Sequence, residues 1–263
     1  RILSVFSSYI FTYLIAKIYG ASSLGIFVLS QTYLLIFSII CRLGFDTASL
    51  KFVSENFTNK RYSNVKIIYY KIIKIVIPFG FIVSTSIFLI SPYLSQLMNK
   101  SEMEIYFKII SFGIIPFSLL FIHSECFRGL KKIVHYAAFR NMSIPFVGSL
   151  ILLILYLFEV NNKYIPIFSF LSSIFILSII AFYLWISIIK KFPKDNNKTE
   201  IQYSSILDIS VPMLFTSSMN YMLNWIGIVI LSFYVSDVNI GIYNVAMKIS
   251  LLTSISLFAI NSI

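Results

Sequence analysis

The chain has 263 residues, of which 58% are apolar and only 12% are charged, and its formal net charge is +11. A water-soluble domain carries about 25% charged residues, so this composition excludes a soluble globule. The basic excess does not indicate nucleic-acid binding, because the lysines and arginines gather in a few connecting segments rather than along one face.

Seven long apolar runs and the start of an eighth follow one another, each near the roughly 20 residues that a membrane-spanning helix needs. They cover residues 2–19, 25–43, 67–90, 105–123, 135–158, 164–189 and 206–233, and the last begins near residue 240. The runs lack the two-residue alternation of barrel strands. We therefore predict an all-α, multi-pass integral membrane protein.

The connections between the runs differ in charge. Fifteen of the 21 basic residues lie in the connections that follow the second, fourth and sixth runs, and the first of these connections covers residues 42–74. The alternate connections hold only four basic residues. The positive-inside rule then predicts that the basic connections and the N-terminus lie in the cytoplasm. The longest hydrophilic stretch, residues 190–205, is too short for a soluble domain. The two cysteines and two histidines have no metal-ligand spacing, so we expect no metal and no cofactor.

A short pattern occurs twice along the chain. Residues 19–27 read YGASSLGIF and residues 235–243 read VSDVNIGIY, and a displacement of 216 positions places Gly25 on Gly241. Six runs separate the copies, an even number, as a parallel repeat requires. We predict a two-lobed bundle with a six-helix N-terminal lobe at residues 1–200 and the beginning of a truncated second lobe at residues 201–263.

Several motifs, in this order and spacing, resemble one family over nearly the whole chain. They are AKIYG (16–20), LGIF (24–27), RLGF (42–45), CFRGLKK (126–132), ISVPM (209–213) and NIGIY (239–243). The family is the polysaccharide transporters, which are the Wzx-type flippases of O-antigen and capsule units within the MOP exporter superfamily. The resemblance implies two six-helix lobes, as in MATE and other MOP proteins, around a cavity that opens alternately to each side.

The same resemblance implies a cargo and a place. The cargo is an undecaprenyl-pyrophosphate-linked oligosaccharide, which is moved across a bacterial cytoplasmic membrane without enzyme chemistry. Membrane lipids and polysaccharide-assembly proteins are the other expected partners, and nucleic acid is not one.

A pyrophosphate head inside a bilayer needs fixed cations, because an unpaired charge in hydrocarbon is costly. Arginine suits this role, since its planar fork holds two phosphate oxygens at once. We expect Arg42 to be a cavity cation near the cytoplasmic end of the second run, Lys248 to lie about 10 Å in from the outer end of the eighth run, and Lys17 to lie near the outer end of the first. The alternative for each is that its charge snorkels to the headgroups.

Four other residues are candidates for a gate or for coupling to an ion gradient: Glu125, His123, Arg128 and Asp46. Glu125 and His123 lie where the fourth run meets a basic connection. The alternative for Glu125 is a structural pair with Arg128 at i, i+3. Asp46 either orients Arg42 or is solvated.

Two other functions fit the same composition. A membrane-embedded polysaccharide polymerase or ligase commonly has a long external loop, whereas the external loops here are short. A cation-coupled multidrug exporter of the same superfamily often has an acidic residue in its first span, whereas no Asp or Glu lies between Arg1 and Gly20. Both observations favour a transporter of anionic cargo.

Overall fold

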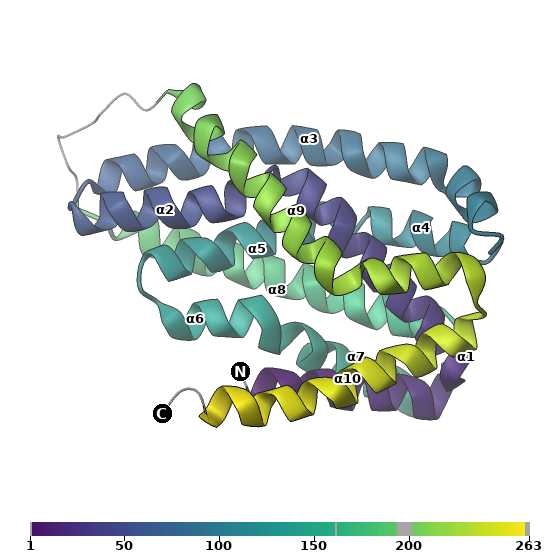
Figure 1. Cartoon of the computed structure of the whole chain (residues 1–263). Helices are drawn as coiled ribbons and strands as arrows, with labels where there is room; N and C mark the ends of the chain where they lie inside the picture. Colours follow the sequence, from purple (N-terminus) through teal and green to yellow (C-terminus); the bar gives the residue numbers. More distant parts are fainter. Residues whose placement is uncertain (1, 161, 194–201, 261–263) are drawn as a thin grey trace.

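The computed structural model describes residues 2–160, 162–193 and 202–260. In these ranges every regular element is helical. In chain order the elements are α1 (Ile2–Arg42), α2 (Phe45–Thr58), α3 (Tyr62–Leu97), α4 (Met103–Ser111), α5 (Ile114–Gly129), α6 (Ile133–Ala137), the π-helix η1 (Ala138–Met142), α7 (Ser143–Leu157), α8 (Ile165–Lys190), α9 (Tyr203–Tyr234) and α10 (Asp237–Ile260). Figure 1 shows them as one elongated bundle.

Four helices, α1, α3, α8 and α9, are each long and apolar enough to cross a membrane. Two further segments qualify when a bent pair counts as one: α4 with α5, bent by 50°, and residues 133–140 with α7, bent by 48°. The prediction of an all-α membrane protein is confirmed. The eight predicted runs become up to six such segments, because the first two runs share α1 and α10 does not qualify within the described residues.

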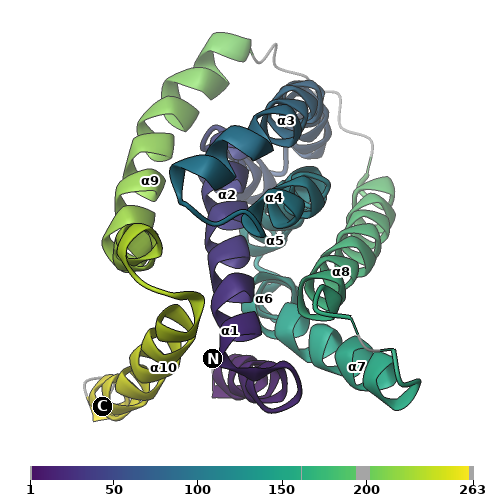
Figure 2. The ribbon, with the colours of Figure 1, turned by 90° about the vertical axis from the view of Figure 1, so that its right-hand side faces the viewer.

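A break at Gly20 divides α1 into two halves that correspond to the first two predicted runs. Gly20 has φ 84° and ψ 173°, a conformation that glycine adopts without steric cost. A Cβ atom here would meet nothing within 4 Å, so the backbone angles rather than close packing favour glycine. Figure 2 shows the N-terminal half of α1 nearly end-on beside the N label, while the second half runs up the view. The break therefore divides α1 into two helical halves that run in different directions.

The connection that we expected between residues 42 and 74 is largely helical. It contains α2 and the first three turns of α3, joined to α1 by Leu43 and Gly44, which both have positive φ. Helix α2 buries Phe45, Ala48 and Val53 completely. These apolar residues recur at the spacing of one helix face, which the basic residues of the segment obscure in the sequence. This correction matters because α2 positions Asp46.

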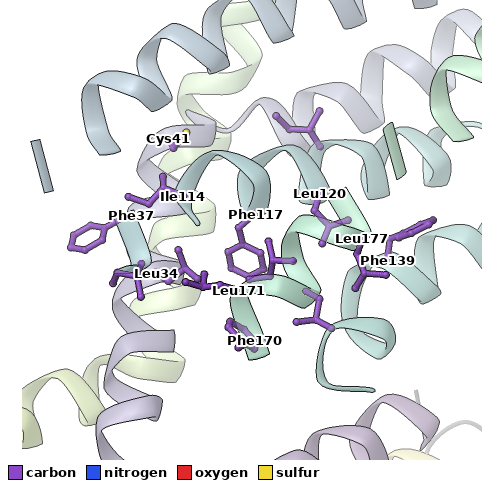
Figure 3. Close-up of a cluster of buried hydrophobic side chains, with 14 of the residues drawn as sticks. Leu34, Phe37, Cys41, Ile114, Phe117, Leu120, Phe139, Phe170, Leu171 and Leu177 are labelled. Carbon is purple, nitrogen blue, oxygen red and sulfur yellow. The ribbon is translucent and has the colours of Figure 1, made fainter. Parts of the chain in front are cut away.

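The bundle core lies between the second half of α1, α5 and α8. Figure 3 shows Leu34 and Phe37 of α1, Ile114 and Phe117 of α5, and Phe170 of α8 in one cluster of hydrophobic side chains, and all five are buried. The rings of Phe117 and Phe170 meet edge to face at 6.4 Å between centroids. Because side chains in such a core are closely packed, the helices that carry them cannot shift relative to one another without opening voids. The core therefore holds α5 rigidly against α1.

Two glycines bring α1 and α10 into backbone contact. A Cβ atom on Gly25 would overlap the carbonyl oxygen of Asp237, and one on Gly241 would lie 2.5 Å from the carbonyl oxygen of Ala21. The displacement that relates Gly25 to Gly241 also relates Ala21 to Asp237. The contact is therefore reciprocal between the two copies of the repeated pattern. Small residues permit such close approach of helices in membranes.

The two ends of the bundle differ in charge. Figure 1 places the α2–α3 and α5–α6 turns at one end, and the α3–α4 and α9–α10 turns at the other. The first pair of turns carries Lys60, Arg61, Lys131 and Lys132, whereas the second pair carries Lys100, Glu102 and Asp237. The charge asymmetry of the connections is thus an asymmetry between opposite ends of the folded bundle.

An ion pair ties the α9–α10 turn to the end of α3. The Lys100 ammonium donates to Asp237 at 2.6 Å and to the Val235 carbonyl at 3.1 Å, and the two charged side chains are only 13% and 24% exposed. A second pair at this end, Lys163 with Glu102 at 3.1 Å, is about half exposed. The hydrogen bond to Glu102 raises the pKa of Lys163.

We expect Asp237→Asn to lower the free energy of unfolding by about 1–2 kcal/mol, because it weakens a charge-assisted hydrogen bond that solvent does not replace. Thermal unfolding in detergent measures this change. Glu102→Gln is the matched control and should have no measurable effect, because exposed ion pairs contribute little. Equal effects of the two substitutions would contradict the prediction.

Candidate functional site

Two adjoining cavities lie inside the bundle. The first, of about 320 Å³, is lined by residues of α1, α2, α5, η1 and α9. The second, of about 180 Å³, is lined by residues of α1, α5, η1, α7, α8 and α10. Both are lined by Leu35, Phe121 and Arg140. The shared wall makes the two cavities parts of one polar region within an apolar bundle.

Arg42, at the C-terminal end of α1, lines the first cavity although it is only 4% exposed. Its Nε donates to the Ser38 carbonyl at 3.1 Å, and its Nη1 donates to the Asp46 carboxylate at 3.0 Å. The guanidinium carbon lies 4.1 Å from the centroid of the Phe121 ring. Asp46 is itself buried, so it orients Arg42 and is not a solvated surface residue.

Arg140 lies in η1, the π-helical turn at the bend between α6 and α7. Its guanidinium carbon is also 4.1 Å from the Phe121 ring centroid, and its Nη1 is 3.7 Å from Glu125 Oε1. This Nη1 is buried and has no hydrogen-bond partner among the described residues. Because π-turns often occur at functional sites and Arg140 lines both cavities, it is the strongest candidate that the sequence pattern did not single out.

Glu125 lies between two arginines. It is buried, accepts a hydrogen bond from Arg128 at 3.4 Å, and lies 3.7 Å from Arg140. The i, i+3 pair with Arg128 is therefore present, but Arg128 is about half exposed and its guanidinium lies over Tyr136. The less exposed partner, Arg140, has 26% of its side chain exposed and comes from a different helix.

Lys248 of α10 lies against the first half of α1 and lines the second cavity. Its ammonium donates to Ser8 Oγ at 2.9 Å, to the Ser8 carbonyl at 3.3 Å and to the Thr12 hydroxyl. The Tyr9 hydroxyl in turn donates to the Lys248 carbonyl. The charge of Lys248 thus points toward the interior rather than toward an end of its helix.

The family model for polysaccharide biosynthesis proteins matches residues 2–263. The chain belongs to this family. The resemblance that the sequence motifs indicated is therefore confirmed. A solved structure described as "protein A" is similar over 95% of this chain, with a TM-score of 0.69 and 15% identity. At this identity the likeness shows the fold alone. The chain spans 57% of the length of that structure, and a comparison with curated proteins finds no match.

Three of the predicted site residues of this polysaccharide biosynthesis protein line neither cavity. Arg128 is one of them and is about half exposed. Lys17 is exposed, and its ammonium lies 5.6 Å from the ring centroid of Tyr13 on the same helix. His123 is fully buried in the core, where Nε2 lies 3.0 Å from the Tyr69 hydroxyl and the ring packs on Phe182. Of the predicted residues, Arg42, Asp46 and Lys248 line the cavities. Glu125 lies beside Arg140, which lines both. Lys17, His123 and Arg128 are not part of this region.

A polar face of α9 completes the first cavity. Ser217, Asn220 and Asn224 line it at a spacing of three and four residues, which places them on one helix face. The Asn220 amide donates to the Thr216 carbonyl at 3.1 Å, and the Asn224 amide donates to the Asn220 carbonyl at 2.6 Å. The amide oxygens remain as acceptors for a polar ligand. This spacing within an apolar run is the signal in the sequence that could have found them.

No group of three or more His, Cys, Asp or Glu side chains comes together in the parts of the chain that the structure describes. The polar region therefore combines arginines, a lysine, two carboxylates and amides. Such a set binds anions and hydroxyl groups.

Proposed function

We propose that this protein is a transporter that moves an undecaprenyl-pyrophosphate-linked oligosaccharide from the inner to the outer leaflet by alternating access. The observation that carries the proposal is the placement of Arg42, Arg140 and Lys248 around adjoining cavities inside an apolar bundle. Buried cations in a membrane protein are costly unless they serve a ligand path or are paired.

The charges around the cavities suit a diphosphate head. Asp46 and Glu125 offset Arg42 and Arg140 when no anion is bound, which lowers the cost of burying the two guanidinium groups. Each guanidinium has donors beyond those directed at its carboxylate. A diphosphate therefore gains charge-assisted hydrogen bonds without first breaking the ion pairs.

The α9 amides suit the sugar part of the same ligand. Sugar hydroxyl groups donate to carbonyl oxygens and accept from N–H groups, and Asn220 and Asn224 present both on one wall of the first cavity. Among the described lining residues, no serine or cysteine lies beside a histidine as a nucleophile would require. These features support transport rather than a polymerase or ligase reaction.

We further propose that the protein lies in a bacterial cytoplasmic membrane with its N-terminus and its basic turns in the cytoplasm. The positive-inside rule supports this orientation, since Lys60, Arg61, Lys131 and Lys132 gather at one end of the bundle. In this orientation Arg42 lies on the cytoplasmic side, where the lipid-linked sugar enters. Polysaccharide-assembly proteins remain proposed partners.

The test is transport by the full-length protein in vesicles that contain a polyprenyl-pyrophosphate-linked sugar, with a lectin reporting the sugars that reach the far leaflet. We expect Arg140→Gln and Lys248→Gln each to slow transport about tenfold or more, because each removes a charged hydrogen-bond donor to phosphate. Lys17→Gln is the matched control and should leave the rate within about twofold, since Lys17 lies outside the cavities. Equal rates for all three variants and the wild type would reject the proposal.

A further inference from the structure

The ring of Phe121 contacts two guanidinium groups. The guanidinium carbons of Arg42 and Arg140 are each 4.1 Å from the ring centroid. The two guanidinium carbons are therefore no farther apart than twice this distance, and both cations lie against the same ring.

Each arginine also lies near a carboxylate. Asp46 accepts from Arg42 at 3.0 Å, and Glu125 lies 3.7 Å from Arg140. The result is a cluster of five groups, Asp46, Arg42, Phe121, Arg140 and Glu125, contributed by α1, α2, α5 and η1. The Phe121 ring is held in place because it packs against Phe117, at 4.8 Å between centroids.

The ring has an electrostatic as well as a steric effect. Two guanidinium groups at this separation repel each other. The faces of an aromatic ring carry partial negative charge, so the ring attracts both cations. An aliphatic side chain of similar size fills the same space but attracts neither cation. Phe121 therefore stabilises a pair of like charges that would otherwise move apart.

We propose that Phe121 is a positioning residue that sets the spacing of Arg42 and Arg140 for an anion with two linked phosphates. The inference rests on the proposed function and deepens it. A single phosphate engages one guanidinium at a time, whereas a diphosphate reaches both. Nη1 of Arg140 faces Glu125 at 3.7 Å, and the other N–H groups of this guanidinium are the donors for the second phosphate.

The experiment compares the affinity of the purified full-length protein for inorganic pyrophosphate and for inorganic phosphate by calorimetric titration. We expect the wild type to bind pyrophosphate about tenfold or more tightly than phosphate. Phe121→Leu should bring the two affinities to within about threefold, because the arginines lose their fixed spacing. Phe121→Tyr keeps the aromatic faces and should keep the preference.

Phe107→Leu is the matched control, since this ring is fully buried in the core, lines neither cavity and has no guanidinium contact among the described residues. It should keep the wild-type preference. If Phe121→Leu does not fold, Phe121→Met carries the same expectation.

The outcomes separate the two proposals. A folded Phe121→Leu or Phe121→Met variant with an unchanged pyrophosphate preference would overturn the positioning role and leave the proposed function standing. Loss of the preference in Phe121→Tyr or Phe107→Leu would also overturn that role. A wild type that binds neither anion would overturn both.

Discussion

Alanine at Gly25 is expected to lower the free energy of unfolding by about 1–3 kcal/mol or more, the range of overpacked sites. The added Cβ atom would overlap the Asp237 carbonyl oxygen, which belongs to the backbone of α10 and cannot rotate away. The helices must therefore separate. Thermal unfolding of the purified protein in detergent measures the loss.

Gly227→Ala is the matched control for this prediction. Its Cβ atom would meet only the hydroxyl end of the Tyr243 side chain, at 3.2 Å, which can move aside. Both substitutions gain the same intrinsic helix propensity, up to about 1 kcal/mol, so their difference reports the backbone contact alone. Gly241→Ala should behave like Gly25→Ala, since it meets the Ala21 carbonyl oxygen. An unaltered melting temperature in Gly25→Ala would show that α1 and α10 do not pack in this way.

The second large effect is expected at the Arg42–Asp46 pair. Arg42→Gln leaves the buried Asp46 carboxylate without its cation, which typically costs about 3–5 kcal/mol. Asp46→Asn leaves the guanidinium unpaired in the same way. We expect the double variant Arg42→Gln/Asp46→Asn to recover most of the lost stability, because no uncompensated charge stays buried. Unfolding in detergent measures all three variants.

Transport separates the structural role of this pair from its proposed role in ligand binding. The double variant should remain unable to move a lipid-linked sugar at the wild-type rate, because the cavity has lost a cation that its stability no longer needs. Vesicle transport by the full-length protein provides the measurement. A double variant that is both stable and fully active would mean that Arg42 serves the fold alone.

The membrane-spanning helices were largely predictable because hydrocarbon restricts what can cross it. A backbone in lipid must satisfy its own hydrogen bonds. Long apolar runs therefore indicate helices almost regardless of which apolar residues they contain. Helix α2 was not predictable on this basis, because Lys51 and Glu55 on its exposed face keep the segment from forming a continuous apolar run. The repeated pattern related Gly25 to Gly241 in the sequence, but only the structure shows that the two glycines pack against each other's copy.

The site residues were predictable where a charged residue stands alone in an apolar run. They were not predictable where charged residues are common in the surrounding sequence. Arg42 and Lys248 stand out because each interrupts or ends an apolar run. Arg140 follows three other basic residues in what resembles an ordinary cytoplasmic connection, and the π-turn that brings it into the bundle has no signature in the sequence. Phe121 is one of 26 phenylalanines. Its importance depends on two arginines from distant segments, so no local pattern could reveal it.

The π-turn at Ala138–Met142 lies at the bend between α6 and α7 and also carries the charged side chain of Arg140. In an ordinary α-helix the same residues would follow a straight path, and Arg140 would leave its place beside Phe121 and Glu125. The bend of this segment and the affinity of Arg140 for an anion are therefore thermodynamically linked. Any anion held by Arg140 would stiffen the joint between α6 and α7, and any movement that straightens the joint would release the anion.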